Sequence, residues 1–147
     1  MKCLSLTAPW GIFVADRVKR YETRSWKTSY RGLIAIHSSK TFPGWAKDLC
    51  LDDPYFVEAL APHGIQTRRD LAEKLPLGAI IAVVTLVDIV RTEDVRERLS
   101  ARERAFGDYG DHRFAWLLNN ARWLPEPIPY KGALGLFDAS DAQEAAS

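Results

Sequence analysis

A nearly continuous run of apolar and β-branched residues at positions 79–90 constrains the fold of this chain more than any other feature. β-Branched residues favour extended backbone, and a run without polar alternation is typical of a strand buried on both faces. The longest apolar stretch, residues 78–87, is far shorter than the ~20 residues that a membrane-spanning helix needs. We therefore expect a sheet built around this strand and no association with a membrane.

Shorter patterns predict the remaining strands of the sheet. Apolar residues that alternate with polar ones, or short β-branched runs, predict strands at residues 2–6, 21–24, 32–38, 114–118, 123–129 and 133–137. Asn119 and Asn120 are expected to form the turn between the strands at 114–118 and 123–129. Six or seven short strands with helices inserted between them predict an α+β fold, a small and mostly antiparallel β-barrel with peripheral helices.

Three segments predict those helices. Apolar residues at helical spacing predict a first helix that Thr7 would cap and that ends near Lys19. A second helical stretch begins at Pro43, and Thr67 caps a third. The chain has 147 residues, which favours one domain, here residues 1–137. Residues 138–147 are small and polar, and we expect them to be a disordered tail.

Composition excludes several classes of protein. The formal net charge is +1, which excludes a strongly basic, histone-like binder but allows a local basic patch. The first ten residues lack the apolar core and cleavage site of a secretory signal. Cys3 and Cys50 cannot build a disulfide framework, so a reducing cytoplasm is the expected location. No group of side chains has metal-ligand spacing, and we expect neither a metal nor another cofactor. The oligomeric state is left open.

Positive charge is concentrated between residues 17 and 40. This window holds a single acid, Glu22, and seven basic residues, which gives a formal charge of +6 and leaves −5 for the rest of the chain. The basic residues are Arg17, Lys19, Arg20, Arg24, Lys27, Arg31 and Lys40. Aromatic residues, among them Trp26, lie between them. Cations that contact phosphate and rings that stack on unpaired bases are typical of a surface that binds single-stranded nucleic acid.

Several segments together resemble a known family. They are Leu6-Thr7-Ala8-Pro9-Trp10, Lys19-x-x-Glu22-x-Arg24-Ser25-Trp26, Tyr30-Arg31-Gly32, Ile36-His37-Ser38-Ser39-Lys40, Leu77-Gly78-Ala79-Ile80-Ile81, Phe114-Ala115-Trp116 and the run from Pro127 to Phe137. In order and spacing they resemble the ASCH domain family, which is related to the PUA domains. The resemblance implies a β-barrel with a cleft at one mouth, lined by the first helix and the strand that holds Glu22 and Arg24. It also implies binding of RNA or of modified nucleotides, and in some members hydrolysis of N4-acetylcytidine, RNA cleavage or a role in transcription coactivators.

The residues of this expected cleft suit nucleic-acid contact. Lys19, Arg24 and Lys27 can bind phosphate, and Trp26 can stack on a base. Hydroxyl and ammonium groups at the end of the third strand could contact phosphate or sugar. These are Ser38, Ser39 and Lys40. We therefore predict that the domain binds single-stranded RNA or a modified nucleotide in a basic cleft at the barrel mouth.

Two other functions stay open at this point. Lys19 and Glu22 could form the catalytic pair of a hydrolase that acts on a modified nucleoside of the N4-acylcytidine type or on RNA, with Glu22 activating a water molecule. Family members that hydrolyse acetylcytidine carry a nucleophilic threonine three residues after the lysine. This chain has Glu22 there, and Thr23 is expected on the opposite face of the strand. The near-zero net charge also leaves room for a protein-interaction domain.

Overall fold

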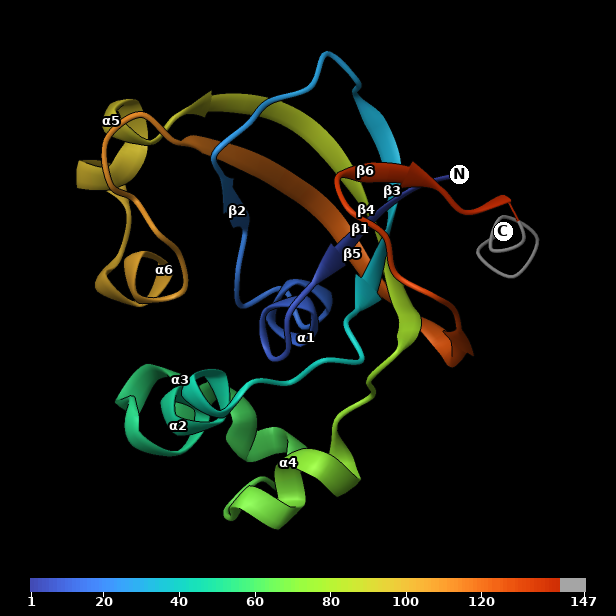
Figure 1. The fold of residues 1–147 in the computed structure, drawn as a ribbon. Coiled ribbons are helices and arrows are strands. Elements are labelled where there is room, and N and C mark those ends of the chain that lie inside the picture. Colours follow the sequence, from blue (N-terminus) through green and yellow to red (C-terminus); the bar gives the residue numbers. More distant parts are fainter. Residues whose placement is uncertain (141–147) are drawn as a thin grey trace.

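The apolar run at residues 79–90 forms the central strand of the fold, as predicted. The computed structural model describes residues 1–140, and in it strand β4 (Ala79–Arg91) pairs with a neighbour on each side (Figure 1). Ile81 and Val84 of β4 belong to the main core, whereas Ile80 and Val83 belong to a second cluster. All four side chains have almost no exposed surface, so the burial of this strand explains why its sequence shows no polar alternation.

Six strands form one curled sheet around this centre. The other five are β1 (Lys2–Leu6), β2 (Tyr21–Arg24), β3 (Gly32–Ser38), β5 (Phe114–Pro129) and β6 (Leu136–Asp138). Their order is β2-β5-β4-β3-β1-β6. Only β1 and β3 are parallel and the remaining pairs are antiparallel, so the sheet is mixed rather than uniformly antiparallel. The strand order is linear, and the barrel is therefore a half-barrel with β2 and β6 as its edges. This sheet, together with the helices inserted between its strands, confirms the predicted α+β class.

Helix α1 (Trp10–Ala15) packs against the sheet and carries the chain from β1 to the distant edge strand β2 (Figure 1). Its start differs from the prediction, because Pro9 rather than Thr7 occupies the N-cap position and no side chain caps the helix. Its end also comes earlier than Lys19. Arg17 has a φ of 64°, and the N–H groups of Arg17 and Val18 bond back to the carbonyls of Val14 and Phe13. This Schellman motif turns the chain and directs Lys19 inward.

Short helices cover one end of the sheet and its rim. They are α2 (Gly44–Asp52), α3 (Pro54–Leu60), η1 (Ala61–His63), α4 (Arg68–Lys74), α5 (Thr92–Val95), η2 (Arg96–Arg98) and α6 (Ala101–Ala105). The capping of α4 is as predicted: Thr67 accepts from the N–H of Asp70, and the Asp70 carboxylate accepts from the N–H of Thr67. Helices α2, α3 and α4 form one group below the sheet, and α5 and α6 lie beside β2 (Figure 1).

Three boundaries differ from the predictions. The two strands expected at 114–118 and 123–129 are one strand, β5, which continues through Asn119 and Asn120. Asn120 has a φ of 56°, so the turn-like residue sits at an irregularity of the strand, where its register against β4 shifts. The last strand covers Leu136–Asp138 instead of residues 133–137. Ala139 is fully buried and its N–H bonds to the Met1 carbonyl, so the ordered domain extends past residue 137. The rest of the expected tail, residues 141–147, lies outside the described residues.

Candidate functional site

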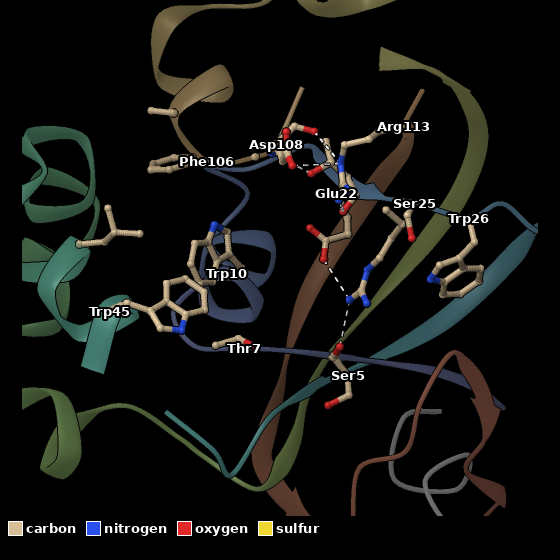
Figure 2. A pocket seen from close by; sticks show the side chains of 15 residues that line it. Ser5, Thr7, Trp10, Glu22, Ser25, Trp26, Trp45, Phe106, Asp108 and Arg113 are labelled. Atoms are coloured by element: carbon tan, nitrogen blue, oxygen red, sulfur yellow. Dashed lines mark hydrogen bonds and ion pairs between the residues drawn. The ribbon is translucent and has the colours of Figure 1, made fainter. Parts of the chain in front are cut away.

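A cavity of about 620 Å³ opens between β2, the start of α1, α2 and the segment that follows α6 (Figure 2). We call it the first cavity. Its walls come from segments far apart in the sequence, and the sheet topology brings them together because α1 returns the chain across the sheet to β2. The volume lies within the range of about 300–1,000 Å³ that is usual for sites binding small molecules.

Glu22 is the central polar group of the first cavity. Its side chain is only 10% exposed and forms ion pairs with two cations. Lys19 Nζ lies 3.4 Å from Glu22 Oε1, and Arg24 Nη2 lies 3.1 Å from Glu22 Oε2. The carboxylate is thus compensated by two positive charges, which offset the free-energy cost of burying it.

Lys19 pairs with Glu22 from the protein interior. Its side chain has no exposed surface, and Nζ also donates to the Tyr21 carbonyl. Lys19 does not line the first cavity, whereas its partner Glu22 does. The expected contact of Lys19 with a ligand stays a prediction. Sequence spacing placed Lys19 beside Glu22 correctly, but it gave no measure of depth.

Arg24 closes the mouth of the half-barrel. Its Nη2 donates to the Ser5 carbonyl at 3.0 Å as well as to Glu22, which ties edge strand β2 to the end of β1. Its Nε is buried and has no hydrogen-bond partner within residues 1–140. Arg24 lines the cavity and its side chain is 24% exposed, so it retains surface for a ligand.

A second ion pair lies at the rim of the first cavity. Arg113 Nε is 3.4 Å from Asp108 Oδ2 and donates to the Asp108 carbonyl at 3.1 Å. Thr23 is buried, and its Oγ1 accepts from the Asp108 N–H at 3.0 Å. With Glu22 and Asp108 against Arg24 and Arg113, the formal charge of the lining is zero. The basic cleft expected from the sequence is not found here, because the cations of the 17–40 window are distributed over several elements.

Three tryptophans line the first cavity. Trp10 and Trp45 lie on one side of the Glu22–Arg24 pair with ring centroids 5.7 Å apart, and Trp26 lies on the other (Figure 2). Trp26 rests edge-on against the buried Trp116, with centroids 4.9 Å apart. Trp45, in contrast, is 61% exposed although it is large and apolar. An exposed ring beside a polar centre is a suitable platform for stacking.

The other predicted residues lie elsewhere. Ser39 and Lys40 line a second cavity of about 850 Å³, which shares Ser5 with the first. Lys27 lies outside both, with its Nζ 5.7 Å above the ring of Phe114. Ser38 is fully buried, and its hydroxyl has no partner in the described part of the chain. The strand register shifts after Ile36, and His37 and Ser38 are both buried. Ser38 lines neither cavity, and its expected contact with a ligand stays a prediction.

The family comparison agrees with this architecture. The model of the ASCH domain matches residues 4–138 of the chain. The chain belongs to the ASCH domain family. Two crystal structures show the same fold: the ASCH protein from Zymomonas mobilis and a mutant of that protein. Their TM-scores are 0.58 and 0.56 and their identity is 13% in both cases. The first comparison covers 98% of this chain and 91% of that one, and the second covers 97% and 93%.

Sequence relatives are much longer proteins. "Activating signal cointegrator 1" from Homo sapiens and from Mus musculus is 25% identical over 133 residues, which is 88% of this chain and 21% of each relative. The ASCH domain described here thus corresponds to about a fifth of those proteins.

Within residues 1–140, no helix is long and apolar enough to cross a membrane, and no group of three or more potential metal ligands is present.

The residues of the first cavity that sequence reasoning missed include an exposed tryptophan and an ion pair. Trp45 comes from α2, and Asp108 and Arg113 come from the loop after α6. None of them lies within the basic window or within the segments that carry the family resemblance. The exposure of a tryptophan and the pairing of Asp108 with Arg113 appear only when the chain is folded.

Proposed function

We propose that this ASCH domain binds an unpaired nucleotide of RNA, with the base in the first cavity. The observation that carries the proposal is a buried carboxylate–guanidinium pair surrounded by three tryptophans. A carboxylate accepts hydrogen bonds from amino or ring N–H groups of a base, and a guanidinium donates to its carbonyl or ring nitrogen atoms. Single-stranded RNA is read in this way, by stacking on aromatic side chains and by hydrogen bonds to exposed base edges.

The formal charge of the residues that line the first cavity favours binding of a base over binding of a phosphate. A phosphate would meet two carboxylates, those of Glu22 and Asp108, in a lining of zero formal charge. A base is uncharged and carries both donors and acceptors along one edge. It matches the alternating polarity of Glu22 and Arg24, which lie 3.1 Å apart and do not repel it.

Trp45 offers the sharpest test of this proposal. It is 61% exposed, so Trp45→Ala should fold normally, whereas loss of one stacking partner should weaken binding about 5- to 150-fold. Affinity is measured by fluorescence anisotropy with labelled single-stranded RNA. Tyr55→Ala is the matched control, because Tyr55 is a partly exposed aromatic residue that does not line the first cavity.

A second variant tests the guanidinium. Arg24→Lys keeps the charge but loses the planar arrangement of donors, and it should also weaken binding. Wild-type affinity in both Trp45→Ala and Arg24→Lys would overturn the proposal.

Hydrolysis of a modified nucleoside or of RNA is the second candidate, and Glu22 is the residue that favours it. Its carboxylate faces the cavity and could accept a proton from water. Thr23 gives less support, because its Oγ1 accepts from the Asp108 backbone and it lies beside Glu22 rather than in the position of the family's nucleophile. Turnover of N4-acetylcytidine or of RNA that disappears in Glu22→Gln would make the domain an enzyme.

A role in protein interaction is the third candidate. It is suggested by the name of the cointegrator relatives, of which this domain matches 21%. The exposed ring of Trp45 would be the contact point in that case. If the domain fails to bind RNA at low salt, the RNA-binding proposal is excluded and protein interaction remains a candidate.

A further inference from the structure

The second cavity adjoins the first at a single shared residue of β1. Ser5 lines both: its carbonyl accepts from Arg24 on the side of the first cavity, and its hydroxyl lies 2.8 Å from His37 Nδ1 on the side of the second. The cavities measure about 620 and about 850 Å³. A ligand larger than one nucleoside could therefore extend from one into the other across Ser5.

The two cavities differ in charge. The first has a formal charge of zero, whereas the second is lined by Lys40 and Lys131 and by no carboxylate among the described residues. Neither ammonium group forms an ion pair or hydrogen bond within residues 1–140. Two unpaired lysines beside the hydroxyls of Ser39 and Thr41 form a site for an anion with several acceptor oxygens, and a phosphodiester is such an anion.

Hydrogen bonds fix the two segments that carry these lysines. The Tyr130 carbonyl can only accept, so His37 Nε2, 2.7 Å away, donates to it, and Nδ1 lies 2.8 Å from the Ser5 hydroxyl. The Gly78 N–H bonds to the Ser38 carbonyl at 2.8 Å, and the Tyr130 N–H bonds to the Gly78 carbonyl at 3.1 Å. Lys40 and Lys131 therefore follow backbone that is anchored to one turn, which lowers the entropy lost when a ligand binds.

Gly132 keeps the second segment close to this wall. A Cβ atom at Gly132 would lie 2.8 Å from His37 Cε1, which is too close for a real side chain, and 3.0 Å from Ser5 Oγ, which is a tight contact. The close backbone approach needs glycine here. It holds the residue before it, Lys131, next to the wall formed by Ser5 and His37.

We propose that the second cavity binds the phosphodiester backbone of the strand whose base enters the first cavity. The inference rests on the proposed function and deepens it: the ligand is an RNA strand rather than a free nucleoside. The neutral, aromatic cavity takes the base, the cationic cavity takes the adjoining phosphates, and Ser5 lies at the crossing between them.

The test compares free nucleosides with trinucleotides of the same base. Binding is followed by the indole N–H resonances of the tryptophans in NMR titrations, which report on the first cavity and tolerate weak affinity. Lys40→Ala/Lys131→Ala should leave nucleoside affinity unchanged and weaken trinucleotide binding about 10-fold or more at low salt. Loss of two phosphate contacts should also reduce the slope of log affinity against log salt by about 1.4, since each contact on a single strand contributes ~0.7.

Lys74→Ala is the single-charge control. Lys74 is half-exposed and pairs with Asp70 on α4, outside both cavities, so its loss should change trinucleotide affinity much less than loss of either lysine of the second cavity. Unchanged trinucleotide affinity in the double variant, with nucleosides still bound, would overturn this inference and leave the proposed function intact. Equal losses for nucleosides and trinucleotides would also overturn it. If the wild-type domain binds neither ligand, the proposed function fails together with it.

Discussion

Lys19 is a charged side chain with no exposed surface, and its position explains the electrostatics of the first cavity. Its Nζ lies 3.4 Å from Glu22 and its charge also acts on Glu103, a second buried carboxylate. Burial raises the pKa of Glu103, against the opposing effects of the Arg20 N–H and of Lys19. One lysine thus balances two acids at the interface of β2 and α6. Because Lys19 does not line the first cavity, its charge acts there through Glu22.

Removal of this cation should cost much of the stability of the domain. Lys19→Met leaves Glu22 buried with Arg24 as its one remaining cation, and breaking a buried pair in this way lowers the free energy of unfolding by about 3–5 kcal/mol. Urea denaturation followed by tryptophan fluorescence measures the change. Lys27→Met, which removes an exposed lysine, should change stability by less than about 1 kcal/mol.

A double variant separates charge from packing. Lys19→Met/Glu22→Gln no longer buries a carboxylate that has lost one of its two cations, so it should be more stable than Lys19→Met alone. If the two substitutions destabilise the domain additively, Lys19 does not stabilise Glu22 and the ion pair is incidental.

At the scale of elements, Asp16 connects three segments that are distant in sequence. It is the C-cap residue of α1, and its carboxylate accepts from Trp123 of β5 at 2.8 Å and contacts His63 of η1 at 2.6 Å. The hydrogen bond to Asp16 raises the pKa of His63 above its usual 6.5, despite an opposing effect of burial. The protonated imidazolium therefore stabilises this junction.

The stability that His63 contributes should depend on pH in a defined direction. Because the folded-state pKa is raised, the contribution is complete below about pH 6.5 and is lost as the pH rises through the folded-state value. Thermal unfolding of the wild type and of His63→Gln should therefore differ most at pH 5.5 and least at pH 8.5. Asp16→Asn should abolish this dependence. A difference in stability that grows with pH would contradict the assignment of Asp16 as the cause.

Local sequence patterns predicted most elements, and the exceptions have a common physical reason. The strand at 79–90 and the cap at Thr67 depend on neighbouring residues, and both were predicted correctly. Asn120 has the left-handed conformation that its residue type favours, yet the chain does not reverse there. Pairing with the long strand β4 extends β5 through this position. Residue type thus favours the dihedral angle, but the predicted turn was wrong because tertiary pairing decides whether such an angle makes a turn or a bulge.

The same distinction applies to the site when the whole molecule is considered. Glu22, Arg24 and Trp26 could be found from sequence because they lie within five positions of one another and resemble a family motif. Trp45 and Arg113 could not, because they reach the cavity only through the packing of α2 and of the loop after α6. The distribution of charge between two cavities is likewise a property of the folded chain.

Three phenylalanines join the parts of the molecule that form the walls of the first cavity. Phe13 of α1, Phe56 of α3 and Phe106 at the end of α6 are buried and in mutual contact. Their ring centroids are 5.4 Å apart for Phe13 and Phe56, 4.6 Å for Phe13 and Phe106, and 5.2 Å for Phe56 and Phe106. Helix α1 is packed on the sheet, so this cluster connects both groups of peripheral helices to the central core.

Phe56→Ala should therefore destabilise the domain as a whole and not the α2–α4 group alone. Loss of a buried phenylalanine costs about 3–5 kcal/mol, and because the cluster is shared, unfolding should remain one cooperative transition at a lower denaturant concentration. Circular dichroism and tryptophan fluorescence should report the same midpoint in urea. Tyr55→Ala, at the neighbouring position on α3, removes a partly exposed ring and should shift the midpoint little. Two separate transitions in Phe56→Ala would instead mean that the α2–α4 group folds independently of the sheet, and the first cavity would then be a junction between two units rather than a site within one.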